Sequence, residues 1–272
     1  MEDRRAAGEL LCDGFVHLRE AHEDGERAWS RAEAVFGEAA KRDELGSGMP
    51  PLETVGRFNI PPIGALRREF QALHLDFGLP VEPAESADVA RFTALYVAPE
   101  QGPTSAFTRI VPLRPLLGQR TWAEPEELLE RLSRYGRANG AAGPRGYVEG
   151  IFARLIEAAD GSPTLPTPNE EGLLCGMEFD TAAQERAHLA ARGLDLERAE
   201  VRVGLGPGEL LLLDNLAIAH GRLGTRRELE LHQLCVGYRS LAASSQAVLR
   251  DRVLAAFAAG EPEPSAYPVA AR

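Results

Sequence analysis

Apolar residues recur along this chain at two different spacings, which separate predicted helices from predicted strands. Between residues 21 and 45 they recur every three to four positions, from Ala28 to Phe36, so we expect a helix there. The stretches 90–99 and 200–205 alternate between apolar and polar positions and are expected to be strands. Further helices are expected over 123–138, 147–159, 181–192 and 241–260, and a Gly- and Pro-rich loop over 46–62.

One stretch, from Phe70 to Pro80, carries candidate chemistry on a predicted strand. His74 and Asp76 are two residues apart, so an extended strand places both side chains on one face. An imidazole and a carboxylate side by side need one more imidazole to hold a divalent iron on three facial positions. The candidate for that third ligand is His220.

His220 follows an apolar run that leads toward a Gly-containing turn. The run reads Gly-Glu-Leu-Leu-Leu-Leu-Asp-Asn from Gly208, and a His-Gly-Arg sequence begins at His220. A single His-x-Asp is common by chance, and its pairing with this downstream strand makes the signal far more specific. His17, His188 and His232 are alternative ligands. The simpler interpretations are that His17 lies on a partly exposed strand, that His188 lies on a charged helix, and that His232 supports the site from a neighbouring position.

These residues resemble a family, the iron(II)- and 2-oxoglutarate-dependent dioxygenases of the taurine dioxygenase/clavaminate synthase-like branch. The similarity spans roughly residues 70–240, as short blocks separated by unmatched sequence. It implies a mainly β fold with flanking helices and a double-stranded β-helix (jelly-roll) core. It also implies Fe(II) held by His74, Asp76 and His220, with 2-oxoglutarate as cosubstrate and O2 as oxidant.

The resemblance also suggests residues for the cosubstrate. Thr104 stands where family members carry a threonine that binds a 2-oxoglutarate carboxylate, although a turn threonine bonded to its own backbone is an equal alternative. Relatives bind the distal carboxylate with an arginine on the strand after the second histidine, but residues 230–234 contain none. Arg227 and Arg239 are the substitutes, and the third possibility is that no such arginine exists.

The substrate is inferred from the family and from the loops. Arg57 and Asn59, before paired prolines, and Gln71, before the metal strand, are candidate substrate contacts, with a solvated surface turn as the plain alternative for the first two. Residues 139–178 are a candidate lid over the metal site. Clavaminate synthase-like relatives suggest a small amino-acid-like substrate and a place in specialised metabolism, as in natural product biosynthesis.

Composition narrows the partners. The net charge is −11 and no basic block occurs, which disfavours nucleic acid and anionic membrane surfaces. Three distant cysteines suggest no disulfide frame, and together with the charged N-terminus they favour a cytoplasmic protein. The length of 272 residues and the lack of an obvious linker predict a single domain over residues 1–272.

Two other functions fit the same pattern. One is an iron-dependent oxygenase or oxidase that does not use 2-oxoglutarate, and the other is a catalytically inactive jelly-roll binding protein. A structural zinc site is disfavoured because no cysteine lies near the histidine motifs. The resemblance implies that a carboxylate at Asp76 favours hydroxylation over halogenation, while desaturation and cyclisation remain open.

Overall fold

A computed structural model describes most of the predicted strands. The described residues are 2–20, 22–43, 46–60, 70–75, 85–99, 107–112, 150–151, 181–190, 195–224 and 231–258. For residues 70–75 the description covers the backbone alone, except at Leu73. The elements are α1 (Glu2–Asp13), β1 (Phe15–Leu18), α2 (Gly25–Ala40), β2 (Glu53–Ile60), β3 (Phe70–Leu75), β4 (Ser86–Val97), β5 (Phe107–Pro112), β6 (Gly150–Ile151), α6 (Ala182–Ala190), α7 (Leu196–Ala199), β7 (Val201–Gly204), β8 (Leu210–Asp214), β9 (Ile218–Leu223), β10 (Leu231–Ala242) and α8 (Ala243–Ala258).

The strands form two five-stranded antiparallel sheets. Sheet A has the order β1-β8-β4-β10-β2, and sheet B has the order β6-β3-β9-β5-β7. Pairing is nested: β5 pairs with β7, β4 with β8, β3 with β9, and β2 with β10. Because these pairs alternate between the sheets, the chain winds as a double-stranded β-helix. The predicted jelly-roll core with flanking helices is confirmed.

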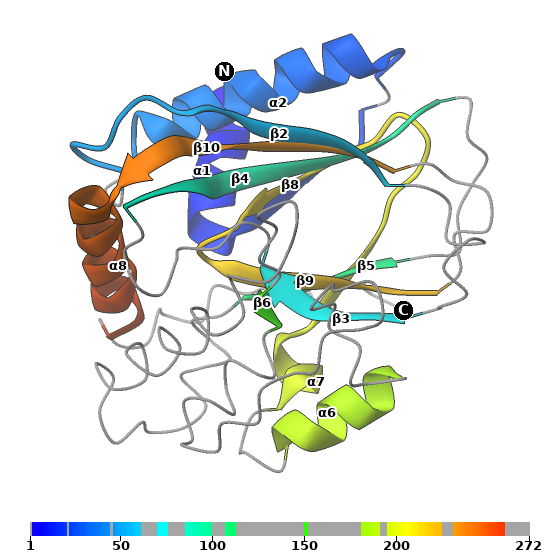
Figure 1. Cartoon of the computed structure of the whole chain (residues 1–272). Helices are drawn as coiled ribbons and strands as arrows, with labels where there is room; N and C mark the ends of the chain where they lie inside the picture. The colour runs from blue at the N-terminus through cyan, green and yellow to red at the C-terminus, as the bar shows by residue number, and fades with distance from the viewer. Residues whose placement is uncertain are drawn as a thin grey trace.

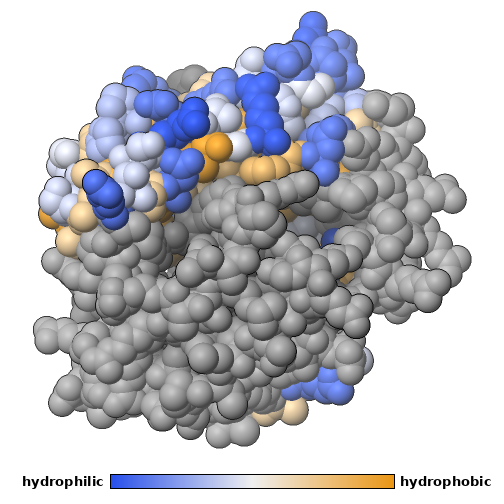
Figure 2. Space-filling view, in the orientation of Figure 1, coloured by the Kyte–Doolittle hydropathy of each residue, from blue (hydrophilic) through white to orange (hydrophobic). Residues whose placement is uncertain are grey.

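Helices cover the outer faces of the two sheets. α1 and α2 lie over the face of sheet A that is turned away from sheet B, and α6 and α7 lie on the far side of sheet B (Figure 1). The outer surface over α2 and β2 is largely hydrophilic (Figure 2). This hydrophilic surface contacts solvent, whereas the apolar faces of the fold are directed inward.

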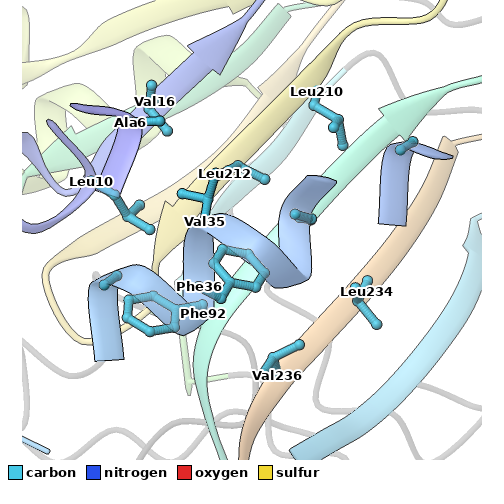
Figure 3. Packing of buried hydrophobic residues seen from close by; sticks show 14 of the residues in the cluster. Ala6, Leu10, Val16, Val35, Phe36, Phe92, Leu210, Leu212, Leu234 and Val236 are labelled. Atoms are coloured by element: carbon cyan, nitrogen blue, oxygen red, sulfur yellow. The ribbon is translucent and has the colours of Figure 1, made fainter. Parts of the chain in front are cut away.

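Two apolar layers hold the sheets in place. Outside sheet A, α1 and α2 pack on alternate residues of β4, β8 and β10 (Figure 3). Phe36 of α2 stacks on Phe92 of β4 with ring centroids 5.1 Å apart. Between the sheets, a second cluster joins Leu95 and Leu211 of sheet A to Ile110 and Ile218 of sheet B. Membership of one of these clusters therefore tells which face of its sheet a residue occupies. Residues two positions apart on a strand occupy the same face.

Three sequence predictions need correction. The loop expected over 46–62 contains β2, because Glu53–Ile60 pairs with β10 along its whole length and its β-forming residues outweigh the flanking Gly and Pro. The apolar run expected to carry His220 to a turn is two strands, and His220 lies inside the second. Gly150–Ile151, inside an expected helix, pairs with β3 as a strand.

None of the described helices combines the length and the apolar character that crossing a membrane would require. The terminal helix expected over 241–260 is confirmed as α8. Most of the proposed lid, residues 139–178, lies outside the described residues, so the lid and the single-domain assignment stay predictions.

Candidate functional site: two histidines on adjacent strands

His74 and His220 occupy directly opposite register positions of the β3–β9 pair. The register joins Phe70 to Leu223 and Gln71 to Arg222, and then joins His74 to His220. Three steps along β3 match two steps along β9, so β3 contains a β-bulge between Gln71 and His74. A regular strand would have placed Leu73 opposite His220 instead. The extra residue therefore sets which position of β3 meets His220.

His220 lies on the inner face of sheet B. It lies two residues after Ile218 on β9, so the two side chains share one face, and it pairs across the sheet with Ile110 of β5. Both isoleucines belong to the cluster between the sheets, so the imidazole is directed toward the same inter-sheet space. Only 5% of His220 is exposed. Such a position suits a ligand that must work away from bulk water.

A buried ion cluster holds the turn that leads into β9. The Arg91 guanidinium donates to Asp214, the last residue of β8, and its Nε lies 2.8 Å from Oδ2 of Asp43. Asp214 Oδ1 also accepts the Leu216 amide at 3.0 Å, which closes the Asp-Asn turn. Burial alone would lower the pKa of Arg91, but Asp214 and Asp43 raise it well above its ordinary value. The Asp-Asn sequence before His220 therefore has a structural task, which is to direct β9 into sheet B.

A second buried cluster fastens the bulge in β3. The Leu73 amide donates to Oε1 of Glu185 at 2.8 Å, across from α6. The same carboxylate accepts from Arg109 of β5 at 2.6 Å, and Arg109 also donates to Glu200 at 2.7 and 3.0 Å. Side chains of Arg109 and Glu185 are fully buried. Because a bulge removes an amide from the strand ladder, Glu185 supplies the acceptor that this amide would otherwise lack.

Charge keeps this second cluster together. Burial alone would lower the pKa of Arg109, but Glu185 and Glu200 raise it overall. Burial alone would raise the pKa of Glu200, but hydrogen bonds and charge from Arg109 and Arg202 lower it below its ordinary value. Ile110, the next residue along β5, belongs to the inter-sheet core. Since neighbouring residues of a strand point to opposite faces, Arg109 and its cluster lie on the outer face of sheet B. The cluster therefore supports the His74 position from behind.

Arg222 is half-buried and differs from the fully buried Arg91 and Arg109. It follows His220 by two residues on β9, and its Nε is buried without an acceptor. Partial burial lowers the pKa of Arg222 to about 10. The group is therefore still a cation at neutral pH, and it lies on the same face of β9 as His220.

The structure places two of the predicted substrate residues on the far side of sheet A. Arg57 and Asn59 of β2 pair in register with Leu234 and His232 of β10. Leu234 belongs to the cluster under α1 and α2, so this face is turned away from sheet B. Arg57 lies 3.3 Å from Glu33 of α2, and Asn59 Oδ1 lies 2.9 Å from Nδ1 of His232. Both are therefore separated from His220 by the sheet, and their role as substrate contacts stays a prediction.

The alternative histidines have other surroundings. His232 shares the outer face with Asn59 and with Tyr96, whose ring centroid is 6.0 Å away. His17 lies on the edge strand β1, and its Nε2 is 2.8 Å from Oε2 of Glu209. His188 lies on α6, on the outer side of sheet B. Of the candidate histidine positions, only that of His74 is paired with His220.

Several predicted residues fall outside this description. Asp76 follows the last described residue of β3, and Thr104 and Arg227 lie in segments that the structure does not describe. Gln71 occupies the register position opposite Arg222. Arg239 is exposed on β10, next to an irregularity in the pairing with β4. Among the described side chains, no three His, Cys, Asp or Glu residues gather at one point, and the proposed iron ligands include two residues beyond that set.

Sequence reasoning missed Arg222, Arg109 and Glu185. Arg222 was within the quoted His-Gly-Arg motif, and its two-residue distance from His220 was a usable signal. Arg109 breaks an apolar strand, Phe107–Pro112, and a charge at such a position indicates a buried partner. Glu185 carried no signal, because its helix has ordinary helical composition and its partners are distant in sequence.

The comparisons with known proteins match solved structures alone. No family model and no curated protein matches the sequence. PvcB from Pseudomonas aeruginosa is 16% identical over 89% of this chain and 82% of that one, with a TM-score of 0.45. An asparagine oxygenase in complex with Fe(II), 2S,3S-3-hydroxyasparagine and succinate is 15% identical over 86% and 78%, with a TM-score of 0.42. The non-heme iron oxygenase OrfP, in complex with Fe, succinate and (3S)-hydroxy-L-Arg, is 15% identical over 85% and 80%, with a TM-score of 0.44.

Proposed function

We propose that this chain is a non-haem iron(II)- and 2-oxoglutarate-dependent oxygenase that oxidises a C–H bond of a small amino-acid-like molecule. The observation that carries the proposal is the register of β3 and β9, which sets His74 opposite His220. Directly opposite positions of an antiparallel pair have Cβ atoms about 4.5–5.5 Å apart, a separation that two ligands of one metal ion can span. Asp76 follows His74 by two residues and supplies the carboxylate.

The donor set fits iron(II). Two imidazoles and one carboxylate on one side of the ion leave the remaining positions open to small molecules, as in non-haem iron oxygenases. A bound iron with 2-oxoglutarate and O2 supplies the oxidising power for an unactivated C–H bond. The protein's own part is to hold the ligands and to exclude water. The burial of His220 and the apolar cluster around Ile110 and Ile218 serve that second part.

The other parts of the proposal come from the sequence. Thr104 is proposed to bind a carboxylate of 2-oxoglutarate, and Arg227 and Arg239 are the candidate arginines for its distal carboxylate. Gln71 is proposed to contact the substrate. Residues 139–178 are proposed as a lid. The reaction is proposed as a hydroxylation, desaturation or cyclisation in specialised metabolism, carried out in the cytoplasm. An oxygenase that does not use 2-oxoglutarate is the second candidate, because β10 carries Gln233 and no arginine over residues 231–234.

Metal binding and cosubstrate turnover test the proposal together. Calorimetric titration with Mn(II), a redox-stable substitute for iron(II), is expected to show one site in the parent protein. His74→Ala, Asp76→Ala and His220→Ala should each lose that site. His232→Ala, on the outer face of sheet A, should keep it and serves as the matched control. Succinate formation from 2-oxoglutarate with Fe(II) and O2 then separates the two oxygenase candidates, because only the first produces it.

A further inference from the structure

Two fully buried arginines of the described residues are neutralised by carboxylates, and the half-buried Arg222 differs from both. Arg91 is paired with Asp43 and Asp214, and Arg109 is paired with Glu185 and Glu200. Arg222 has a buried Nε without an acceptor, and no carboxylate of the described residues pairs with its guanidinium. A buried cation without a counter-charge lowers stability, so folds rarely keep one without a use.

The position of Arg222 indicates that use. β9 runs between β3 and β5, and Arg222 pairs in register with Gln71 on one side and with Thr108 on the other. It shares the inner face of sheet B with Ile218 and His220. Two residues along a strand span about 6.6 Å, so the guanidinium is within one small molecule's length of a metal bound at His220.

We propose that Arg222 binds a carboxylate of the small molecule that occupies the inter-sheet space beside His220. This inference rests on the proposed function, because it takes the metal at His220 as the other anchor of the ligand. A guanidinium suits the task because its planar fork meets a carboxylate through two parallel hydrogen bonds. A ligand held at both points is a short chain of carbons with a terminal carboxylate.

Two ligands of this reaction class share that chemistry. One is the distal carboxylate of 2-oxoglutarate, and the other is the carboxylate of an amino-acid-like substrate. Arg222 differs from the two arginines suggested by the sequence, because Arg239 is exposed on β10 and Arg227 lies outside the described residues. Arg222 is fixed on the strand that carries His220, so its distance from the metal does not depend on a loop.

The first arm of the test compares two cosubstrate molecules. Mn(II)-loaded parent protein, Arg222→Leu and Arg222→Lys are titrated by calorimetry with 2-oxoglutarate and with 2-oxopentanoate, in which a methyl group replaces the distal carboxylate. If Arg222 binds the cosubstrate, Arg222→Leu weakens 2-oxoglutarate about tenfold to a hundredfold and leaves 2-oxopentanoate unchanged. Arg222→Lys should recover part of the loss. Arg198→Leu, an exposed change on α7, is the control and should behave as the parent protein.

The second arm covers the substrate. The twenty standard L-amino acids are titrated against the Mn(II)-loaded protein with 2-oxoglutarate present, and each one that binds is repeated as its α-amide. If Arg222 binds the substrate, Arg222→Leu weakens the acid and not the amide, while 2-oxoglutarate affinity is unchanged. Affinity that Arg222→Leu leaves unchanged for every carboxylate bound by the parent protein overturns the inference.

A stability readout separates this inference from general damage and from failure of the proposed function. Because Arg222→Leu removes a half-buried cation that pairs with no carboxylate of the described residues, the ligand-free variant should keep or raise the parent melting temperature. A large fall in that temperature would show that Arg222 has a structural partner and would overturn the inference. If the parent protein binds no Mn(II), the proposed function fails. Titration of the metal-free parent protein and of metal-free Arg222→Leu with glutarate then tests the role of Arg222 by itself. Weaker glutarate binding by the variant supports the carboxylate anchor, and equal binding by the two proteins rejects it.

Discussion

His74 lies directly opposite His220 in the antiparallel pair of β3 and β9, and a β-bulge one residue earlier produces that match. The bulge leaves the Leu73 amide outside the ladder, and Glu185 accepts it at 2.8 Å. Glu185 is in turn held by Arg109, so the alignment of the two histidines depends on a buried ion pair on the opposite face of the sheet. Support of this kind fixes the relative positions of residues that bind a common ligand.

Removing Glu185 is therefore expected to affect metal binding as well as stability. Glu185→Ala leaves Arg109 and the Leu73 amide without a buried acceptor, which should lower the free energy of unfolding by about 3–5 kcal/mol. Glu185→Gln keeps an acceptor for the amide but removes the charge beside Arg109, so its effect should be smaller. Gln184→Ala, an exposed change on the same helix, is the control. Urea unfolding gives the stability of each variant, and Mn(II) titration gives its metal affinity.

The metal affinity decides what Glu185 does. If the bulge aligns His74, the Mn(II) affinity of folded Glu185→Ala should fall at least tenfold, and Glu185→Gln should fall between that variant and the parent protein. A destabilised Glu185→Ala protein with parental Mn(II) affinity would show that the cluster supports the sheet alone.

The ion cluster of Arg91 predicts a large cost for Asp214. Asp214→Ala leaves a fully buried guanidinium with one carboxylate fewer and opens the hydrogen bond to Leu216, so about 3–5 kcal/mol of stability should be lost. Glu26→Ala, an exposed change in the first turn of α2, should stay within about 0.5 kcal/mol of the parent protein. Urea unfolding measures both variants. A loss for Asp214→Ala no larger than that of Glu26→Ala would contradict the structural task assigned to the Asp-Asn turn.

Close backbone contact makes Gly237 of β10 sensitive to any side chain. A Cβ at this position would lie 2.0 Å from the Val89 carbonyl oxygen and 2.8 Å from Ala90 Cα, so Gly237→Ala must separate β10 from β4. Gly8 of α1 has open space around it, and Gly8→Ala should stabilise the helix by about 0.5–1 kcal/mol. Thermal unfolding should therefore shift in opposite directions for the two variants. Equal shifts would contradict the close packing of β4 on β10.

The lowered pKa of Glu200 predicts a specific loss of stability in acid. Because its folded pKa lies below the unfolded value of about 4.3, its contribution is fully present above that pH and is lost as the pH falls through the folded pKa. The stability difference between the parent protein and Glu200→Gln should be constant from pH 7 to pH 5 and should shrink below that range. Gln184→Ala, which removes no titratable group, is the control for the pH series. A Glu200→Gln difference that persists unchanged at pH 3 would contradict the Arg109–Glu200 pairing.

Sequence patterns predicted the parts of this fold that depend on local order. The periodicity from Ala28 to Phe36 located α2, and the His-x-Asp spacing located the strand of His74. The β2 strand was missed because its pairing with β10 is a long-range contact, while the local Gly and Pro content favours a loop. Neither the bulge in β3 nor the burial of Glu185 could be predicted, because each depends on partners more than a hundred residues away.

Iron and 2-oxoglutarate binding are tested most directly by an anaerobic titration of the metal-free protein with Fe(II), with and without 2-oxoglutarate, followed by absorption spectroscopy. If His74, Asp76 and His220 hold the iron and leave room for the 2-oxo acid, a visible metal-to-ligand charge-transfer band should appear only when both are present. His232→Ala should keep the band, and Asp76→Ala should lose it. Iron binding without the band would favour the oxygenase that does not use 2-oxoglutarate. An undiminished band in Asp76→Ala would contradict the assignment of the iron ligands.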